Sequence, residues 1–173
     1  MYDTPLTIEQ MLTILADTPS RIAAQTAGLA PAQLRTAPAP GEWSANDVLA
    51  HLRSCADVWG NYIALILAED RPTFRAVNPT TWIKGTDYPH QEFRPSLQAF
   101  AAQRAELLAV LEGLAPEDWS RTATVTGSGK PRERSVYTYG QWLANHERSH
   151  VKQFERIAEA MRVSAPAWAG TPC

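Results

Sequence analysis

The strongest constraint on the fold is the recurrence of apolar residues every three or four positions in four long segments. That spacing puts the apolar side chains on one face of an α-helix, which must then be buried against other helices. The segments predict helices at about 6–27, 45–67, 96–112 and 138–161. The 173 residues are enough for one domain with a real core. We therefore predict an all-α fold, a single four-helix bundle over residues 1–161 with an irregular tail at 162–173.

Local signals predict where these helices begin and bend. Ser44, with Asp47 three positions later, predicts the capped start of the second helix, and Thr138, with a glutamine three positions later, predicts the start of the fourth. Pro19 lies inside the first periodic segment. Since proline removes a backbone donor, that helix is expected to be kinked or restarted there, with Thr18 as a cap.

The connections between the helices are long. Residues 70–93 are rich in proline and aromatic residues and lack periodicity, which predicts a crossover along the bundle. The segment "VTGSGKPRE" contains a turn signal and leaves room for a short β-hairpin between the third and fourth helices. A weak repeat, "GLAPAQLRTA" at 28–37 and "GLAPEDWSRTA" at 113–123, predicts two related helical hairpins.

Charge and composition exclude several classes of protein. The formal net charge is −2, which argues against a nucleic-acid-binding surface. Lys130, Arg132 and Arg134 are offset by Glu133 and are interpreted as a solvated loop. No run of about 18 apolar residues is present, and the chain does not begin with a signal-peptide pattern. We therefore expect a cytoplasmic protein that does not bind a membrane and acts on a small molecule.

Three of the four histidines are predicted to point into the bundle. His146 and His150 are four residues apart and share a helical stripe with Leu143 and Phe154. His51 lies on the flank of the apolar stripe of the second helix. A single inward histidine is usually a core residue, but three imidazoles in one bundle form a ligand set for a divalent ion, with a fourth position open to water or substrate. His90, in the crossover, is expected at the surface.

The sequence "HERSH" at 146–150 also fits the H-E-x-x-H pattern of zinc proteases. The extended form of that motif needs glycine at 153 and histidine at 156, where this chain has Gln153 and Arg156. No glutamate on a separate downstream helix is available as a third ligand. The third ligand must come from upstream, and His51 is the candidate, so the protease interpretation is rejected.

Two charged residues are candidates for a catalytic role. Arg104 falls in the middle of the apolar stripe of the third helix and needs a carboxylate, several carbonyls or an anionic ligand. Glu147 lies at the edge of the inner face, where it either accepts a proton near the metal or forms an ion pair. Asp47 also has two interpretations, because it either closes the helix cap or braces the imidazole of His51.

Together these residues resemble the DinB-like (YfiT-like) family of four-helix-bundle metalloproteins. The likeness is carried by "GLAPAQLRTAPAPGEWSANDVLAHL", by the arginine-containing "FAAQRAELLAVLEGLAPEDW" and by "HERSHVKQF". Residue by residue, the resemblance places the family's metal ligands on His51, His146 and His150, and its glutamine on Gln153. It implies nickel or zinc as the ion, and it also implies a homodimer.

The resemblance implies a metal-dependent enzyme, with thiol-dependent transfer or isomerisation ahead of hydrolysis. The co-substrate would be a low-molecular-weight thiol such as bacillithiol or mycothiol, and Arg104 would hold an anionic group of it or of a second substrate. The alternatives are a metal-dependent hydrolase and a non-catalytic metal- or small-molecule-binding protein. Three tryptophans lie outside the periodic stripes, Trp82, Trp119 and Trp168, and some of them are expected to cover a dimer surface.

Overall fold

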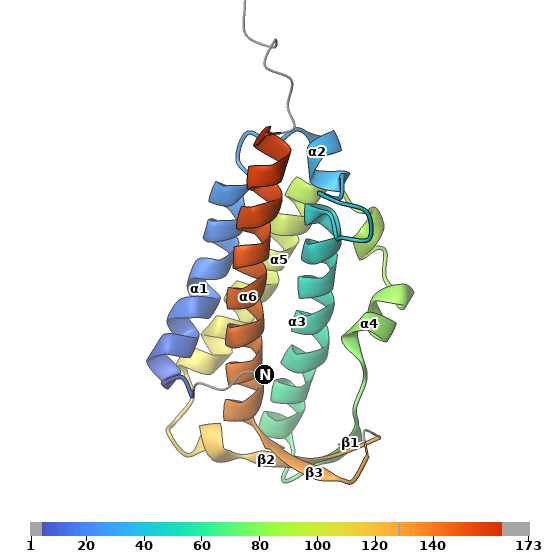
Figure 1. Cartoon of the computed structure of the whole chain (residues 1–173). Helices are drawn as coiled ribbons and strands as arrows, with labels where there is room; N and C mark the ends of the chain where they lie inside the picture. Colours follow the sequence, from blue (N-terminus) through green and yellow to red (C-terminus); the bar gives the residue numbers. More distant parts are fainter. Residues whose placement is uncertain (1–4, 128, 164–173) are drawn as a thin grey trace, which may run out of the picture.

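The computed structural model describes residues 5–127 and 129–163. Four long helices lie side by side (Figure 1), which confirms the predicted helical bundle. They are α1 (Ile8–Gln25), α3 (Ala45–Ala68), α5 (Phe93–Glu112) and α6 (Val136–Val163). α6 includes residues 162 and 163, which the sequence had assigned to the tail, and residues 164–173 lie outside the described part. None of the described helices combines the length and apolarity needed to cross a membrane.

The order of the helices around the bundle differs from the sequence prediction. α1 packs on α5 and α6, and α3 packs on the same two helices. Helices α1 and α3 are consecutive long helices in the sequence, yet they lie at opposite corners of the bundle (Figure 1). Helices α5 and α6 occupy the other two corners. The prediction of two hairpins of adjacent helices was wrong, because each connection is long enough to cross the end of the bundle. The repeated segments instead form the short helices α2 (Pro31–Arg35) and η3 (Asp118–Ser120).

The predicted crossover runs along the outer side of α3 (Figure 1). It hydrogen-bonds to α3 through Asn46, whose side-chain amide donates to the Gln91 carbonyl at 3.1 Å, and through Arg53, whose guanidinium donates to Gln91 Oε1 at 2.5 Å. Asn46 and Arg53 are polar, yet both are buried because the crossover covers them. Its elements are β1 (Thr73–Arg75), α4 (Pro79–Trp82), η1 (Ile83–Gly85) and η2 (Tyr88–His90).

A small sheet closes one end of the bundle (Figure 1). Strands β2 (Thr122–Thr126) and β3 (Arg132–Ser135) pair in antiparallel fashion and form the hairpin for which the sequence left room. The crossover strand β1 joins β2 in parallel, with Phe74 opposite Val125. The sequence did not predict β1, because three residues are too few for a recognisable alternation of apolar and polar side chains.

The ends of α3 and α6 show which capping signals the chain uses. At α3 the Ser44 hydroxyl accepts from the Asp47 backbone, and the Asp47 carboxylate accepts from the Ser44 backbone at 3.0 Å, as predicted. At α6 the Thr138 backbone donates to Ser135 Oγ at 3.1 Å, so the cap is Ser135 and the prediction of Thr138 was wrong. Thr138 occupies the third helical position, where its hydroxyl contacts the Ser135 hydroxyl at 3.0 Å.

Pro19 does not interrupt α1. The helix is continuous from Ile8 to Gln25 with the proline inside it, so the predicted restart at Thr18 was wrong. The Thr18 hydroxyl donates to the Ile14 carbonyl at 2.8 Å instead of capping a new helix. We attribute the continuity to packing, because the residues of α1 on either side of Pro19 are held in two different apolar clusters.

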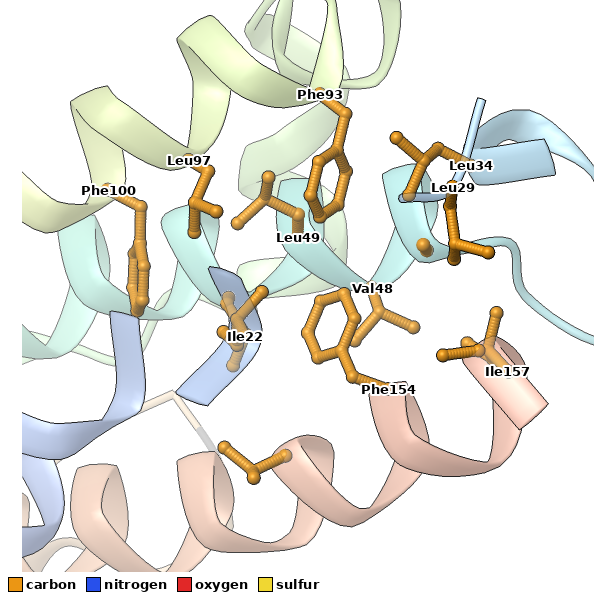
Figure 2. Packing of buried hydrophobic residues seen from close by; sticks show 14 of the residues in the cluster. Ile22, Leu29, Leu34, Val48, Leu49, Phe93, Leu97, Phe100, Phe154 and Ile157 are labelled. Carbon is orange, nitrogen blue, oxygen red and sulfur yellow. The ribbon is translucent and has the colours of Figure 1, made fainter. Parts of the chain in front are cut away.

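The core consists of two apolar clusters stacked along the bundle axis. One joins Leu49, Phe100 and Phe154 (Figure 2), and the other joins Met11 and Leu143 near the sheet. On α6 every residue between the two clusters is polar or ionisable, and each of the other long helices contributes at least one polar side chain close to this segment. This polar layer comprises Thr18, His51, Cys55, Arg104, His146, Glu147 and His150.

Candidate metal centre

The structure brings His51, His146 and His150 together in the polar layer. The Nε2 atoms of His51 and His146 are 3.0 Å apart, and those of His146 and His150 are 3.1 Å apart. α3 supplies the first ring, and one face of α6 supplies the other two because residues four apart lie one above the other. The apolar clusters above and below fix both helices, and so they fix the distance between the rings.

This arrangement fits a shared cation better than hydrogen bonding among the rings. The Nε2 atom of His146 faces two other ring nitrogens, whereas a neutral imidazole nitrogen offers either one proton or one lone pair. Two nitrogens bound to one zinc ion at 2.0–2.1 Å in tetrahedral geometry would lie about 3.3 Å apart. The observed separations, 3.0 and 3.1 Å, are close to that value. The donor set therefore suits a late first-row divalent ion.

Gln153 orients the ring of His150. Its side-chain oxygen lies 2.7 Å from His150 Nδ1, and an amide oxygen only accepts, so the ring proton is on Nδ1. That tautomer leaves the lone pair of Nε2 directed toward His146. A hydrogen bond to the outer nitrogen is the usual way in which a protein fixes a metal-binding histidine.

The three rings are held in the neutral form that binds metals. Burial lowers the pKa of His146 to about 3, with the neighbouring charges of His150 and His51 adding to the effect. Burial, followed by His150, lowers the pKa of His51 to about 4. Burial also lowers the pKa of His150, and the Gln153 hydrogen bond opposes this shift. At neutral pH no proton needs to leave these nitrogens before they coordinate a cation.

Cys55 is a member of the centre that sequence reasoning missed. Its Sγ lies 3.6 Å from His51 Nε2 and 3.9 Å from His146 Nε2. His51, Cys55 and His146 each offer one ligand atom within 4.8 Å of the others, and His150 adjoins this group through His146. Burial, followed by the charge of Glu147, raises the pKa of the thiol to about 12. Its spacing four residues after His51 was the available signal.

Two tryptophans flank the histidines, and a cleft reaches them from the crossover side. Trp43 and Trp59 pack edge-on against His51 and His146, with ring centroids 5.1 and 5.2 Å apart. A cleft of about 390 Å³ is lined by His51, Trp43 and crossover residues including Ile83. A small molecule that enters there contacts the His51 side of the centre.

Arg104 and Glu147 form an ion pair in the interior. The Arg104 guanidinium donates to the Glu147 carboxylate, and both side chains are almost completely buried. Burial raises the pKa of Glu147, whereas the Arg104 charge and the neighbouring polar side chain of Thr18 oppose this rise. Of the partners that the sequence left open for Arg104, the structure shows a carboxylate, that of Glu147, and the pair joins α5 to α6 next to His146.

The remaining sequence candidates lie apart from the imidazoles. The Asp47 carboxylate accepts from Ser44 at the helix cap, which selects the capping interpretation over bracing of His51. His90 is exposed in η2, as predicted. Trp119, expected on a dimer surface, is instead buried in the cluster near the sheet.

Comparison with known families gives a match over most of the chain. The model of the DinB superfamily matches residues 14–154. That range contains the three histidines, Cys55, Gln153 and the Arg104–Glu147 pair.

Curated relatives and a solved structure also match the chain, at low identity. The chain is 26% identical over 152 residues to a protein of Geobacillus kaustophilus named "putative metal-dependent hydrolase", covering 84% of this chain and 81% of that one. A protein of the same name from Halalkalibacterium halodurans is 26% identical over 147 residues, covering 84% and 85%. YfiT from Bacillus subtilis, whose structure is described as "a probable metal-dependent hydrolase with an unusual four-helix bundle topology", has the same fold. The TM-score is 0.76 at 17% identity, over 90% of this chain and 87% of that one.

Proposed function

Because the chain belongs to the DinB superfamily, we propose that it is a metal-dependent hydrolase whose divalent ion is held by His51, His146 and His150. The observation that carries the proposal is the meeting of the three Nε2 atoms, at 3.0 and 3.1 Å, in a buried polar layer. A divalent ion in such a set polarises a carbonyl or phosphoryl oxygen and lowers the pKa of water. The names of the relatives support hydrolysis.

The protein contributes orientation and dehydration to this chemistry. Gln153 fixes the tautomer of His150, and the two apolar clusters keep α3 and α6 at a constant separation. Trp43 and Trp59 cover the imidazoles on either side and limit the access of water. Because the rings are neutral before they bind, the cation does not have to displace protons at neutral pH.

We place hydrolysis ahead of the thiol chemistry that the sequence favoured. In that hypothesis Arg104 held an anionic group of the thiol or of a second substrate, whereas its guanidinium is engaged by Glu147 in the interior. We propose that Arg104 and Glu147 are positioning residues, which fix α6 against α5 in the turn that carries His146. Transfer to a low-molecular-weight thiol is then the expected reaction only if an added thiol reaches the ion.

The position of Cys55 favours a second candidate, a closed metal site without catalysis. In a tetrahedral zinc site a sulfur at about 2.3 Å and a nitrogen at about 2.0 Å would lie about 3.5 Å apart. The Sγ atom lies 3.6 and 3.9 Å from two of the imidazole nitrogens, so the thiolate is in reach of the fourth position. Three histidines and one cysteine would leave no position for substrate.

Metal content and cobalt spectra test the two candidates. The wild-type chain is expected to bind about one divalent ion, His146→Ala to lose it, and the exposed-site control His90→Ala to retain it. Retention by His146→Ala would contradict the proposed centre. In the cobalt-loaded protein, an open site gives a spectrum that is unchanged by Cys55→Ser and changes when small anions or thiols are added. A thiolate charge-transfer band that disappears in Cys55→Ser would instead establish the closed site.

A further inference from the structure

A second cleft, of about 290 Å³, lies between the sheet and the ends of α3 and α6 near it. Its walls on the helix side are aromatic and include Trp59, Tyr62 and Trp142. On the sheet side it is lined by the cations that the sequence had assigned to a solvated loop, Lys130, Arg132 and Arg134.

The register of the hairpin explains why the cations gather on one side. Arg132 pairs with Val125 and Arg134 pairs with Ala123, so both arginines share the sheet face that carries these apolar residues. Glu133 lies between them in sequence and points to the other face, where it accepts a hydrogen bond from Thr122. The negative charge that balanced this segment in the sequence is therefore on the far side of the sheet.

The cations of this cleft have no carboxylate partners in the described part of the chain. None of the ion pairs found there involves Lys130, Arg132 or Arg134, and no acidic residue lines the cleft. Arg134 lies over the ring of Trp142, with its guanidinium carbon 5.1 Å from the ring centroid. The cleft therefore combines a positive potential with flat apolar surfaces.

The cleft adjoins the metal centre through a single side chain. The ring of Trp59 lines the cleft and also packs against His146, with centroids 5.2 Å apart. Trp142 continues the aromatic wall, 6.1 Å from Trp59 between ring centroids. A molecule seated on this wall lies one aromatic ring away from the imidazoles.

We propose that this cleft is the substrate subsite and that it takes a small molecule with an anionic group joined to a flat apolar body. Lys130, Arg132 and Arg134 bind the carboxylate, sulfonate or phosphate, and Trp142 and Tyr62 stack on the body. The volume accommodates a small molecule rather than a polymer. The inference names the substrate class of the proposed hydrolase, and in that sense it rests on the proposed function.

Binding of a matched pair of probes tests the charge requirement. The anion 2-naphthoate and its neutral analogue 2-naphthamide have the same ring system, and titration calorimetry on the full chain measures both. Naphthoate is expected to bind at least about tenfold more tightly than the amide, since one charge-assisted contact contributes about 1.4 kcal/mol or more. The double variant Arg132→Gln/Arg134→Gln should remove that preference and leave amide binding unchanged.

Two controls each change one charge outside the cleft. Lys152→Gln removes an exposed cation of α6 outside the cleft, and Glu133→Gln changes the opposite face of the same strand, so both should bind naphthoate like the wild type. Arg134 packs on Trp142, so its replacement can disturb folding. If the double variant does not fold, the single variant Arg132→Gln, at an exposed position, replaces it in the test. We expect it to lower the affinity for naphthoate by about threefold or more.

Equal binding of the two probes, or wild-type affinity in the arginine variants, would overturn the inference. Displacement of naphthoate by a single-stranded oligonucleotide at lower concentration would also overturn it, in favour of nucleic acid. The assay is repeated with His146→Ala, which tests the metal centre separately. Charge-dependent binding by a wild-type chain that takes up no divalent ion would sustain the subsite while rejecting the hydrolase, whereas naphthoate binding that survives in His146→Ala would show that the subsite does not depend on the metal.

Discussion

At the scale of single residues, burying the polar layer costs free energy of desolvation, and pairing among its side chains offsets that cost. The Arg104–Glu147 pair and the histidine group lie where the remainder of the bundle is apolar. Charges are tolerated in such a place only when they are paired. Glu147 has two interpretations, a proton acceptor near the metal and one half of a structural pair. The two predict different effects of replacing Glu147 on stability and on hydrolysis.

We expect Glu147→Gln to lower the free energy of unfolding by about 3–5 kcal/mol, because it leaves the buried Arg104 charge without a counter-charge. Adding Arg104→Met should restore much of the loss, since an apolar side chain then fills the space. Urea unfolding of the metal-free chain measures both variants. Unchanged stability of Glu147→Gln combined with lost hydrolysis would contradict the positioning role and support a proton acceptor.

The histidine pKa values predict how stability depends on pH in the metal-free protein. In the unfolded chain these rings titrate near pH 6.5, whereas in the fold the pKa of His51 is lowered to about 4 and that of His146 to about 3. Between those values the unfolded state binds more protons, so stability falls as pH falls from 6.5 and levels off below about 3. We expect urea unfolding to show a smaller difference between pH 7 and pH 5 in His51→Gln. Equal pH dependence in the two proteins would contradict this.

At the scale of elements, α3 and α6 carry the centre, and their ends are fixed by side-chain caps. Ser44 and Asp47 cap α3 reciprocally, and Ser135 caps α6. The cap of α3 lies about two turns before His51, and the cap of α6 lies about three turns before His146. Capping therefore sets the helix register from which the imidazoles project, although no cap residue was found in contact with a ring in the part of the chain that the structure describes.

We expect Asp47→Ala to lower the free energy of unfolding by about 1 kcal/mol, the usual effect of losing a capping interaction. Its affinity for the metal should be unchanged, because the carboxylate contacts Ser44 and not His51. Ser20→Ala, in an exposed turn of α1, is a control for the loss of one local hydrogen bond. A large drop in metal affinity in Asp47→Ala would instead support bracing of His51.

At the scale of the whole molecule, fewer tryptophans now support the prediction of a homodimer. Trp119 packs inside the core, and Trp168 lies outside the described residues. Trp82 is 42% exposed on α4, and its indole nitrogen donates to Asp57 at 3.1 Å, which holds the ring at the surface. Of the tryptophans that led to the dimer prediction, Trp82 alone is seen on the surface in the described part of the chain.

We expect the chain to be a dimer at micromolar concentration and Trp82→Ala to shift it toward the monomer, because an exposed aromatic ring contributes strongly to an interface. Light scattering coupled to size exclusion measures both. Val163→Ala, at another exposed apolar side chain, is the control. A wild-type chain that elutes as a monomer would reject the prediction, and a variant that stays dimeric would place the interface elsewhere.

The sequence by itself determined the helical bundle, the start of α3 and the faces of the long helices that carry the core. Apolar periodicity at 3.6 residues is a local property, so it identified the buried faces of the long helices and placed His51, His146, His150 and Arg104 on or beside them. Spacing by four residues on one helix also fixed the neighbourhood of His146 and His150. These inferences needed no knowledge of which helix packs on which.

Only the tertiary structure decided which groups meet across helices. The pairing of Arg104 with Glu147, the position of Cys55 beside two imidazoles and the diagonal order of the long helices each depend on how separate helices pack. The same holds for Lys130, Arg132 and Arg134, which look balanced by Glu133 in sequence but are separated from it by the alternation of β3. A one-dimensional pattern specifies the face on which a side chain lies, whereas its partner is set by the packing of residues distant in the chain.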